Sequence, residues 1–432
     1  MTEPIMRHRW LICKTSVVFL IVCLIARGGF ADQPADQPPG EQGSMNWSEV
    51  IARLRQEMHQ RPGHAQTRQQ LAIAYNNDGV RLSDQGEWTL AVTQLQEAMR
   101  LDPPNEQFRH NLRQTYLQQA QDGYARHQLD EAIRVLDQLL ALDPDVAQAY
   151  ALRGQIEYDR QRLKEAKAAW ERALALDPAQ TPLRTRLEQL NHELPIESTF
   201  DRLSQAYFDV RYEETLERPV GFDVRDALLE ARRSIGSDFA YWPKHKFVVL
   251  VYSAEQFQAL RRDKPDWIGA YFDGKIRMPL PSDQLNQAAV KQILFHEYTH
   301  AVIHDLTNGT CPLWLNEGLA EYEGRSRRAG SLERLAAAHR ANALIPWPEL
   351  SEHISTARPA EEVALAYEQS YSLVAYLVGR YGFWRIRRIL KAIAEGAPWE
   401  DVLTKEIRLK LSRLETNWRE WLPTLLIQQV GG

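Results

Sequence analysis

Hydrophobic residues recur at helical spacing through most of the first half of the chain. Between residues 47 and 59 they fall three or four positions apart and therefore share one face of a helix. The positions concerned are Trp47, Val50, Ile51, Leu54 and Met58. From about residue 66 to 181 the pattern becomes periodic, because the triplet Leu-Asp-Pro ends an amphipathic segment at 101–103, 142–144 and 176–178. The segment 47–59 is therefore predicted to be a capping helix in front of a helical repeat.

The repeat is marked by residues at fixed distances from each triplet. A tyrosine lies 28 residues before each proline, at Tyr75, Tyr116 and Tyr150. The last two prolines are 34 residues apart and the first two are 41 apart, so we expect seven extra residues near 106–112 to lengthen one helix. A 34-residue helix-turn-helix unit resembles the tetratricopeptide repeat, which implies an all-α array over 47–194 that binds a protein partner. A non-repeating helical bundle is the alternative, and the recurrence of Leu-Asp-Pro at the end of three helical segments argues against it.

The pattern changes near Leu194, after which predicted strands and helices alternate. Residues 205–212 and 246–252 predict strands, and residues 220–235 between them predict a helix. Four further elements are expected: a helix at 254–261 capped by Ser253, a hairpin at 267–280 turning at Asp273-Gly274, and helices at 285–305 and 313–324. The chain is mostly helical from residue 331. Residues 195–432 are therefore predicted to form an α+β domain, with a small sheet packed on the helix 285–305 and a helical second lobe.

The first 31 residues have the features of an export signal. The positive residues Arg7, Arg9 and Lys14 precede an apolar run at 17–26. This run is shorter than the roughly 20 residues needed to cross a bilayer. Gly29 and Ala31 place small residues at −3 and −1 of a cleavage site. We therefore expect a periplasmic or extracellular protein, whereas an uncleaved segment would anchor it in a membrane. Residues 32–46 are rich in Pro, Gly and Gln and predict a flexible linker.

Composition and charge narrow the classes of function. Of the 432 residues 44% are hydrophobic and 25% are charged, and the net charge is −5, so nothing indicates a nucleic-acid partner. Cys13 and Cys23 fall within the expected signal, which leaves Cys311 as the one thiol of the mature chain and no internal disulfide. So few cysteines also exclude a zinc finger built from cysteine and histidine.

The strongest chemical signal is His-Glu-Tyr-Thr-His at 296–300, on the helix expected at 285–305. His296 and His300 share a helix face and can bind one cation, while Glu297 points about 100° away and lies beside that cation. A catalytic zinc needs a third protein ligand and an open position. Glu317, on the next expected helix, can supply the ligand. The sequence therefore predicts a Zn²⁺ site on His296, His300 and Glu317, with Glu297 as general base.

Further motifs follow the first in a characteristic order. HEYTHAVIH at 296–304 precedes WLNEGLAEYEG at 314–324 and AYEQSYSLVAYLVGRYG at 366–382, an order that resembles the gluzincins over roughly 199–426. More specifically, the chain is similar to the peptidase-MA-like family, whose members often carry tetratricopeptide repeats in front. The resemblance implies a zinc metallopeptidase in which Glu297 takes a proton from the attacking water and Tyr367 hydrogen-bonds the tetrahedral oxyanion. It further implies that Glu321 orients the first histidine.

Several assignments stay open at this point. Tyr367 is also spaced as a core aromatic, and Tyr371 is a second candidate for the oxyanion. His304 continues the histidine face, but we expect a residue at the helix end rather than a ligand. We expect Cys311 to be a packed thiol and Glu321 to be either a support for His296 or a solvated charge.

The type of activity also has alternatives. The chain lacks the Gly-x-Met-Glu-Asn element with which aminopeptidases hold a free N-terminus, which favours an endopeptidase acting on a peptide or protein. In that case the hairpin 267–280 offers an edge strand for the substrate. One alternative is a catalytically weak or inactive gluzincin-like scaffold for protein–protein interaction, and another is a zinc hydrolase acting on something other than peptides.

Overall fold

The computed structural model describes residues 46–213, 218–260, 269–280, 287–354 and 358–430. The predicted export signal at 1–31 and the linker at 32–46, except for its last residue, lie outside the described residues. The chain divides into two compact units between Leu194 and Pro195. No helix among the described residues is long and apolar enough to cross a membrane.

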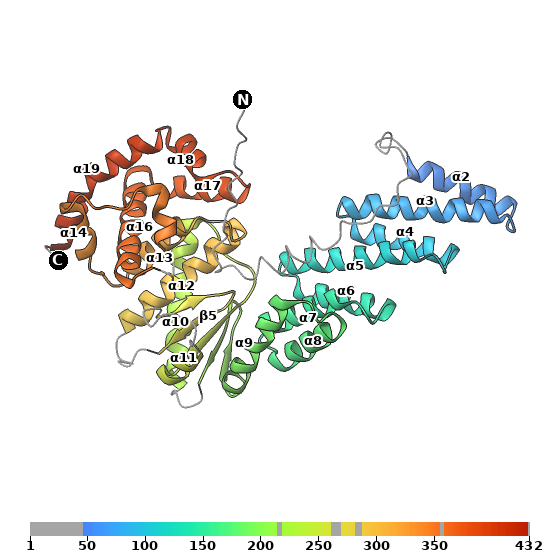
Figure 1. Cartoon of the computed structure of the whole chain (residues 1–432), viewed down its shortest axis with the longest axis horizontal. Coiled ribbons are helices and arrows are strands. Elements are labelled where there is room, and N and C mark those ends of the chain that lie inside the picture. Colours follow the sequence, from blue (N-terminus) through green and yellow to red (C-terminus); the bar gives the residue numbers. More distant parts are fainter. Residues whose placement is uncertain (1–45, 214–217, 261–268, 281–286, 355–357, 431–432) are drawn as a thin grey trace, which may run out of the picture. The chain divides into compact units, whose positions relative to one another are not determined.

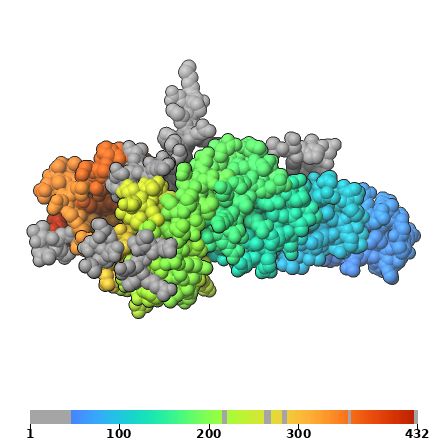
Figure 2. All heavy atoms as spheres, turned by 90° about the horizontal axis from the view of Figure 1, so that it is seen from below, coloured from blue at the N-terminus to red at the C-terminus, as the bar shows by residue number. Residues whose placement is uncertain are grey.

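The repeat unit is built from consecutive antiparallel helices (Figure 1). They are α2 (Trp47–Gln60), α3 (Ala65–Asp84), α4 (Trp88–Leu101), α5 (Glu106–Ala125), α6 (Leu129–Leu142), α7 (Ala147–Asp159), α8 (Leu163–Leu176) and α9 (Thr181–Glu197). In the space-filling view the colours of this unit change steadily from blue to green along its length (Figure 2). Helices that follow one another in sequence therefore lie next to one another, as expected for a stack of repeats.

Small residues let the helices of each pair approach closely. A Cβ placed on Gly154 of α7 would lie 2.2 Å from the Trp170 ring of α8, and one on Gly79 of α3 would lie 2.6 Å from Leu95 of α4. The expected lengthening near residues 106–112 is confirmed, because α5 has 20 residues where α7 has 13. The helix pairs and their matched close contacts agree with a tetratricopeptide-type array.

The second unit contains a mixed five-stranded sheet of order β1-β2-β3-β5-β4. Its strands are β1 (Asp201–Ser204), β2 (Phe208–Tyr212), β3 (Phe247–Tyr252), β4 (Tyr271–Phe272) and β5 (Ile276–Pro279). β2, β3 and β5 run parallel, while β1 and β4 pair antiparallel at the two edges. The apolar run of β3 is buried at every position, as a central parallel strand requires.

The prediction of one strand over 205–212 is wrong at its start. The chain forms a tight hairpin instead, in which β1 pairs with β2 and the Gln205 N–H donates to the Phe208 carbonyl at 2.9 Å. A cross-strand ion pair joins Arg202 to the buried Asp209. The expected hairpin at Asp273-Gly274 is confirmed, and Gly274 adopts the positive φ of +100° that the turn requires. Residues 267 and 268 of its predicted range lie outside the described residues.

Helices make up the rest of this unit. They are α10 (Arg218–Phe239), α11 (Ala254–Leu260), α12 (Gln287–Thr307), α13 (Leu313–Arg325), α14 (Glu333–Arg340), α15 (Leu350–His353), α16 (Ala360–Tyr381), α17 (Phe383–Ala394), α18 (Trp399–Ile407) and α19 (Leu411–Val430). As predicted, Ser253 caps α11, its hydroxyl accepting the Gln256 N–H at 3.3 Å.

The sheet is covered on both faces. Alternate residues of β3, including Val249 and Val251, share one core with α10 and α12. The intervening residues, including Val248 and Leu250, pack with α11 and residues 196–200 on the opposite face. The helix α12 thus has the sheet on one side and α13 on another, and α13 in turn packs on α16 (Figure 1). This places the His-Glu-Tyr-Thr-His stretch in the interior of the unit.

Candidate metal centre

The helix α12 is apolar on most of its circumference, which explains its central place. Phe295, Tyr298 and Val302 are almost fully buried in the core shared with the sheet. The polar positions His296 and His300 are four apart and therefore open on the same side, toward α13. Core packing of one set of side chains thus fixes the direction in which the two imidazoles point.

The two histidines meet the carboxylate of Glu317 from α13. Their Nε2 atoms are 3.1 Å apart. Glu317 Oε2 lies 3.6 Å from Nε2 of His296 and 3.4 Å from Nε2 of His300. The structure therefore brings together the three side chains that the sequence suggested as ligands, with one ligand atom from each lying within 4.8 Å of the others.

This donor set fits a zinc ion. Two imidazole nitrogens and one carboxylate oxygen are the ligands of many catalytic zinc sites, and they leave one coordination position open. Glu317 Oε2 is buried, and among the described residues no group gives it a hydrogen bond. An unsatisfied buried acceptor aimed between two ring nitrogens is costly unless a cation or proton compensates it.

The charges around the site also favour a cation between the three side chains. Burial alone would lower the pKa of His296, but the carboxylates of Glu317 and Glu321 beside its ring nitrogens outweigh burial and hold that pKa well above its usual value. The pKa of His300 is also raised, because the charge of Glu317 outweighs burial. Burial opposes ionisation of Glu317, yet the two imidazoles hold its pKa well below the usual range. The surroundings therefore favour positive charge at this point.

Glu297 lies beside the three converging groups. Its side chain is buried, and its Oε2 atom has no hydrogen-bond partner among the described residues. Burial raises the pKa of Glu297, and the nearby imidazoles only partly offset this. A carboxylate in this environment can accept a proton and hold it.

Each histidine has a support on its other ring nitrogen. Nδ1 of His296 lies 3.3 Å from Oε1 of Glu321, as the resemblance implied. Nδ1 of His300 lies 3.1 Å from Oδ1 of Asn316, a contact that the sequence analysis missed. Such partners select the tautomer and hold the ring in place. The available signal was the position of Asn316 directly before Glu317, at the start of α13.

The two candidate tyrosines of α16 have different neighbours. Burial raises the pKa of Tyr367 well above its usual value, and the nearby carboxylates of Glu317 and Glu297 raise it further. Tyr371, one turn later, lies under the Arg325 guanidinium, whose carbon is 4.7 Å from the ring centroid. Of the two, Tyr367 is the one beside the three converging side chains.

The remaining sequence candidates lie outside this cluster. His304, one turn beyond His300, has its ring centroid 5.9 Å from that of Phe272 on β4. Cys311 is partly buried, and burial followed by the charge of Glu317 raises the pKa of its thiol, which keeps it protonated. Neither residue contributes to the His296–His300–Glu317 group.

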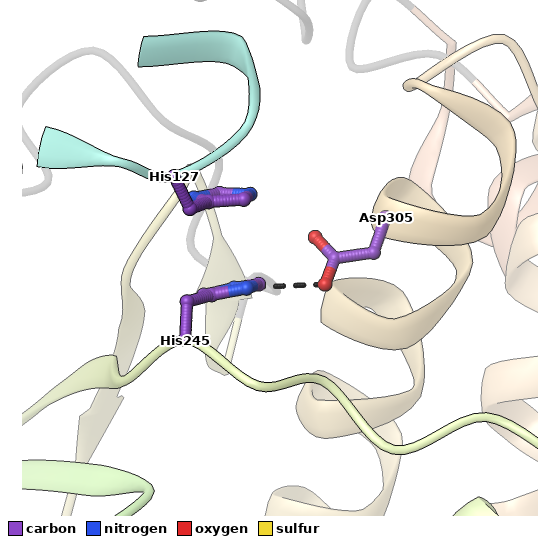
Figure 3. A group of neighbouring side chains, drawn as sticks. All are labelled: His127, His245 and Asp305. Atoms are coloured by element: carbon purple, nitrogen blue, oxygen red, sulfur yellow. Dashed lines mark ion pairs between the residues drawn. The ribbon is translucent and has the colours of Figure 1, made fainter. Parts of the chain in front are cut away.

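A second histidine–carboxylate contact occurs in the same unit. Nε2 of His245 lies 3.5 Å from Oδ2 of Asp305 (Figure 3), and the Tyr241 hydroxyl donates to the same oxygen at 3.4 Å. His245 and Asp305 offer two ligand atoms, against the three that converge between α12 and α13. The α12–α13 site is therefore the stronger candidate for a metal centre in this unit.

Comparison with known proteins gives one family-model match and several similar solved structures. Residues 243–424 match the family model described as "Peptidase MA superfamily". A search of curated proteins finds no match. Similar solved structures include the first TPR of Spaghetti (RPAP3) bound to an HSP90 peptide, with 24% identity and a TM-score of 0.22, covering 29% of this chain and 93% of that one. The Arabidopsis OM64 TPR domain is similar at 21% identity and TM-score 0.22, covering 29% of this chain and 98% of that one. The first TPR domain of human RPAP3 is similar at 24% identity and TM-score 0.21, covering 29% of this chain and 94% of that one.

Proposed function

We propose that the protein is an exported zinc metallopeptidase, because residues 243–424 match the Peptidase MA superfamily model and follow a helical repeat array. The observation that carries the proposal is the convergence of His296, His300 and Glu317, with Glu297 buried beside them. In this proposal the three converging side chains hold one Zn²⁺ ion. The family resemblance and the donor chemistry support the same metal.

Zinc held here would polarise a substrate carbonyl and make a water molecule acidic enough to ionise near neutral pH. Glu297 takes the proton of the attacking water on its Oε2 and later passes it to the leaving nitrogen. Its buried position supports this role, because burial raises the pKa of Glu297 and so lets the carboxylate hold the proton between the two steps.

Tyr367 donates a hydrogen bond to the negative oxygen that develops on the scissile carbonyl. Its raised pKa keeps the hydroxyl protonated, so that it acts as a donor throughout the reaction. Glu321 and Asn316 hold the imidazoles of His296 and His300 in the orientation that keeps both Nε2 atoms directed at one point.

The substrate is a peptide or protein in an extended conformation. The short strand β4 forms one edge of the sheet and packs against α12, so a peptide added antiparallel to it would run past the histidines. A peptide bound along an edge needs no free terminus, which supports an endopeptidase. The repeat unit would recruit a protein substrate or partner through its helical surface.

Replacement of Glu297 by Gln tests the mechanism, because Gln has the same shape but cannot accept the proton. The purified wild type should cleave a mixed peptide library, and Glu297→Gln should lose about 10²–10⁴-fold of this activity while keeping its zinc. Mass spectrometry of the library measures the cleavage, and elemental analysis measures the zinc.

A catalytically weak scaffold makes the opposite prediction for the same variant. If wild type and Glu297→Gln both bind zinc and neither cleaves any peptide, the domain binds metal without turnover. Equal turnover by both proteins would rule out the role of Glu297.

A further inference from the structure

The last residue of α13 is a partly buried arginine that contacts the surroundings of the candidate metal centre. The Arg325 side chain is only 10% exposed, and its Nε donates to Oε2 of Glu321 at 2.8 Å. The other oxygen of Glu321, Oε1, is the one that lies 3.3 Å from Nδ1 of His296. The Glu321 carboxylate is therefore held from both sides, between a histidine of the site and a guanidinium.

The rest of the guanidinium is also engaged. Its carbon lies 4.7 Å from the centroid of the Tyr371 ring on α16, and Nη1 donates to the Ser331 carbonyl at 3.4 Å. A Cβ placed on Gly330 would lie 2.6 Å from Nη1, so the chain passes close to the guanidinium. Arg325 thus joins three segments: α13, the chain at 330–331 that follows it, and α16.

An arginine at the end of a helix often has a simpler role. It can interact with the last carbonyl groups while its head stays in water, where it is mobile and contributes little. Arg325 differs because its side chain is only 10% exposed, donates through two different nitrogens and stacks on an aromatic ring at once. Only the planar fork of arginine can satisfy all three contacts, since a lysine ammonium is a point charge without a stacking face.

We infer that Arg325 is a positioning residue of the metal centre, an inference that rests on the proposed function. Arg325 fixes the rotamer of Glu321, and Glu321 accepts the Nδ1 proton of His296 and so keeps the ring in the tautomer whose Nε2 faces Glu317. Through the Tyr371 ring, Arg325 also ties this arrangement to α16, the helix that carries Tyr367. Loss of the guanidinium frees the Glu321 carboxylate to rotate, and the His296 ring with it.

The test measures zinc affinity on the full-length protein by competition with a chromophoric chelator. The variants are Arg325→Met, which keeps the length of the side chain, Arg325→Lys, which keeps its charge, and Arg419→Met as a matched control. Arg419 makes the same i,i+4 ion pair, with Glu415 at 2.7 Å, and lies 5.8 Å from the Trp418 ring centroid, but it is on α19. Urea unfolding of the metal-free proteins reports stability separately from metal affinity.

We expect Arg325→Met to bind zinc about 10–100-fold more weakly than the wild type, the loss typical when the partner of a ligand is disturbed. The zinc affinity of Arg325→Lys should lie between those of Arg325→Met and the wild type, and the affinity of Arg419→Met should equal that of the wild type. The absorption spectrum of the Co²⁺-loaded protein should change in Arg325→Met and stay unchanged in Arg419→Met, because only the first variant alters the ligand geometry.

The outcomes separate this inference from the proposed function. Wild-type zinc affinity in Arg325→Met, or an equal loss in Arg419→Met, would overturn the role of Arg325 and leave the metallopeptidase proposal intact. A wild type that binds no zinc would overturn both. If Arg325→Met does not fold, Arg325→Lys decides: weakened zinc binding supports the inference, and unchanged binding refutes it.

Discussion

The carboxylates of α13 illustrate how environment separates residues of one type. Glu317 and Glu321 face histidines, and these interactions outweigh burial and lower both pKa values. Glu323 is 2% exposed, and its Oε1 has no hydrogen-bond partner among the described residues. Burial and the nearby Asp238 raise the pKa of Glu323 to about 8, although Arg327 opposes the shift. Two of these carboxylates are thus ionised at neutral pH, while Glu323 keeps its proton.

This difference predicts a pH dependence of stability. The folded pKa of Glu323 lies above the unfolded value, so the folded state binds the proton more tightly and loses stability as pH rises from about 4.5 to about 8. Glu323→Gln cannot ionise, so its stability relative to the wild type should rise by roughly 4 kcal/mol between pH 5 and pH 9. Urea unfolding at both pH values measures the effect. A constant difference between the two proteins across this range would show that Glu323 does not titrate as described.

At the scale of elements, the site depends on how closely α13 approaches α16. The contact is made at Gly318, where an added Cβ would lie 2.5 Å from the backbone oxygen of Ser370 and 2.7 Å from Val374. Because backbone cannot move aside as a flexible side chain can, glycine sets the spacing between the helix that carries Glu317 and the helix that carries Tyr367.

Alanine at two glycines should therefore have opposite effects. Gly318→Ala should destabilise the protein by about 1–3 kcal/mol, because the new methyl group overlaps α16. Gly379→Ala is the control, since that glycine is also helical but has no atom within 4 Å of its added Cβ. It should stabilise the protein by roughly 0.5–1 kcal/mol through helix propensity. Thermal unfolding distinguishes the two variants, and equal shifts of their unfolding temperatures would contradict the close packing at Gly318.

The elements that the sequence predicted well are those with a long and consistent period. The histidine helix, the repeat helices and the turn at Gly274 follow from spacing and turn chemistry, and so does the convergence of His296, His300 and Glu317. The hairpin of β1 and β2 could not be predicted in this way, because a polar four-residue edge strand carries no apolar alternation. The contacts of Asn316 and Arg325 depend on how α13 is rotated against α12 and α16, which spacing within one helix does not specify.

At the scale of the whole molecule, the second unit begins inside a helix. The last turn of α9, from Pro195 to Glu197, belongs with the sheet rather than with the repeats. The fully buried Glu197 accepts from the Tyr252 hydroxyl at 2.7 Å and pairs with the buried Arg277. The hydroxyl and guanidinium come from β3 and β5, so the sheet holds the end of the helix through buried polar contacts.

Removing the charge of Glu197 should therefore destabilise the folded protein. Glu197→Gln removes the charge that pairs with the buried guanidinium of Arg277, which also lies 3.1 Å from Asp273, and should lower stability by roughly 3 kcal/mol. Glu362→Gln is the control, because this carboxylate is 46% exposed beside Arg358 and should change stability by less than about 1 kcal/mol. Urea unfolding followed by tryptophan fluorescence measures both. A Glu197→Gln protein as stable as the control would show that the ion pair does not hold the helix end.

The central claim is that one metal ion joins α12 to α13 through His296, His300 and Glu317, and zinc content tests it most directly. Wild type, Glu317→Gln and the surface control Glu361→Gln would each be equilibrated with buffered zinc, passed through a desalting column and measured by elemental analysis. The account predicts about one zinc ion per chain in the wild type and in Glu361→Gln, and a small fraction of this in Glu317→Gln. A Glu317→Gln protein that retains as much zinc as the wild type, or a wild type that retains none, would contradict it.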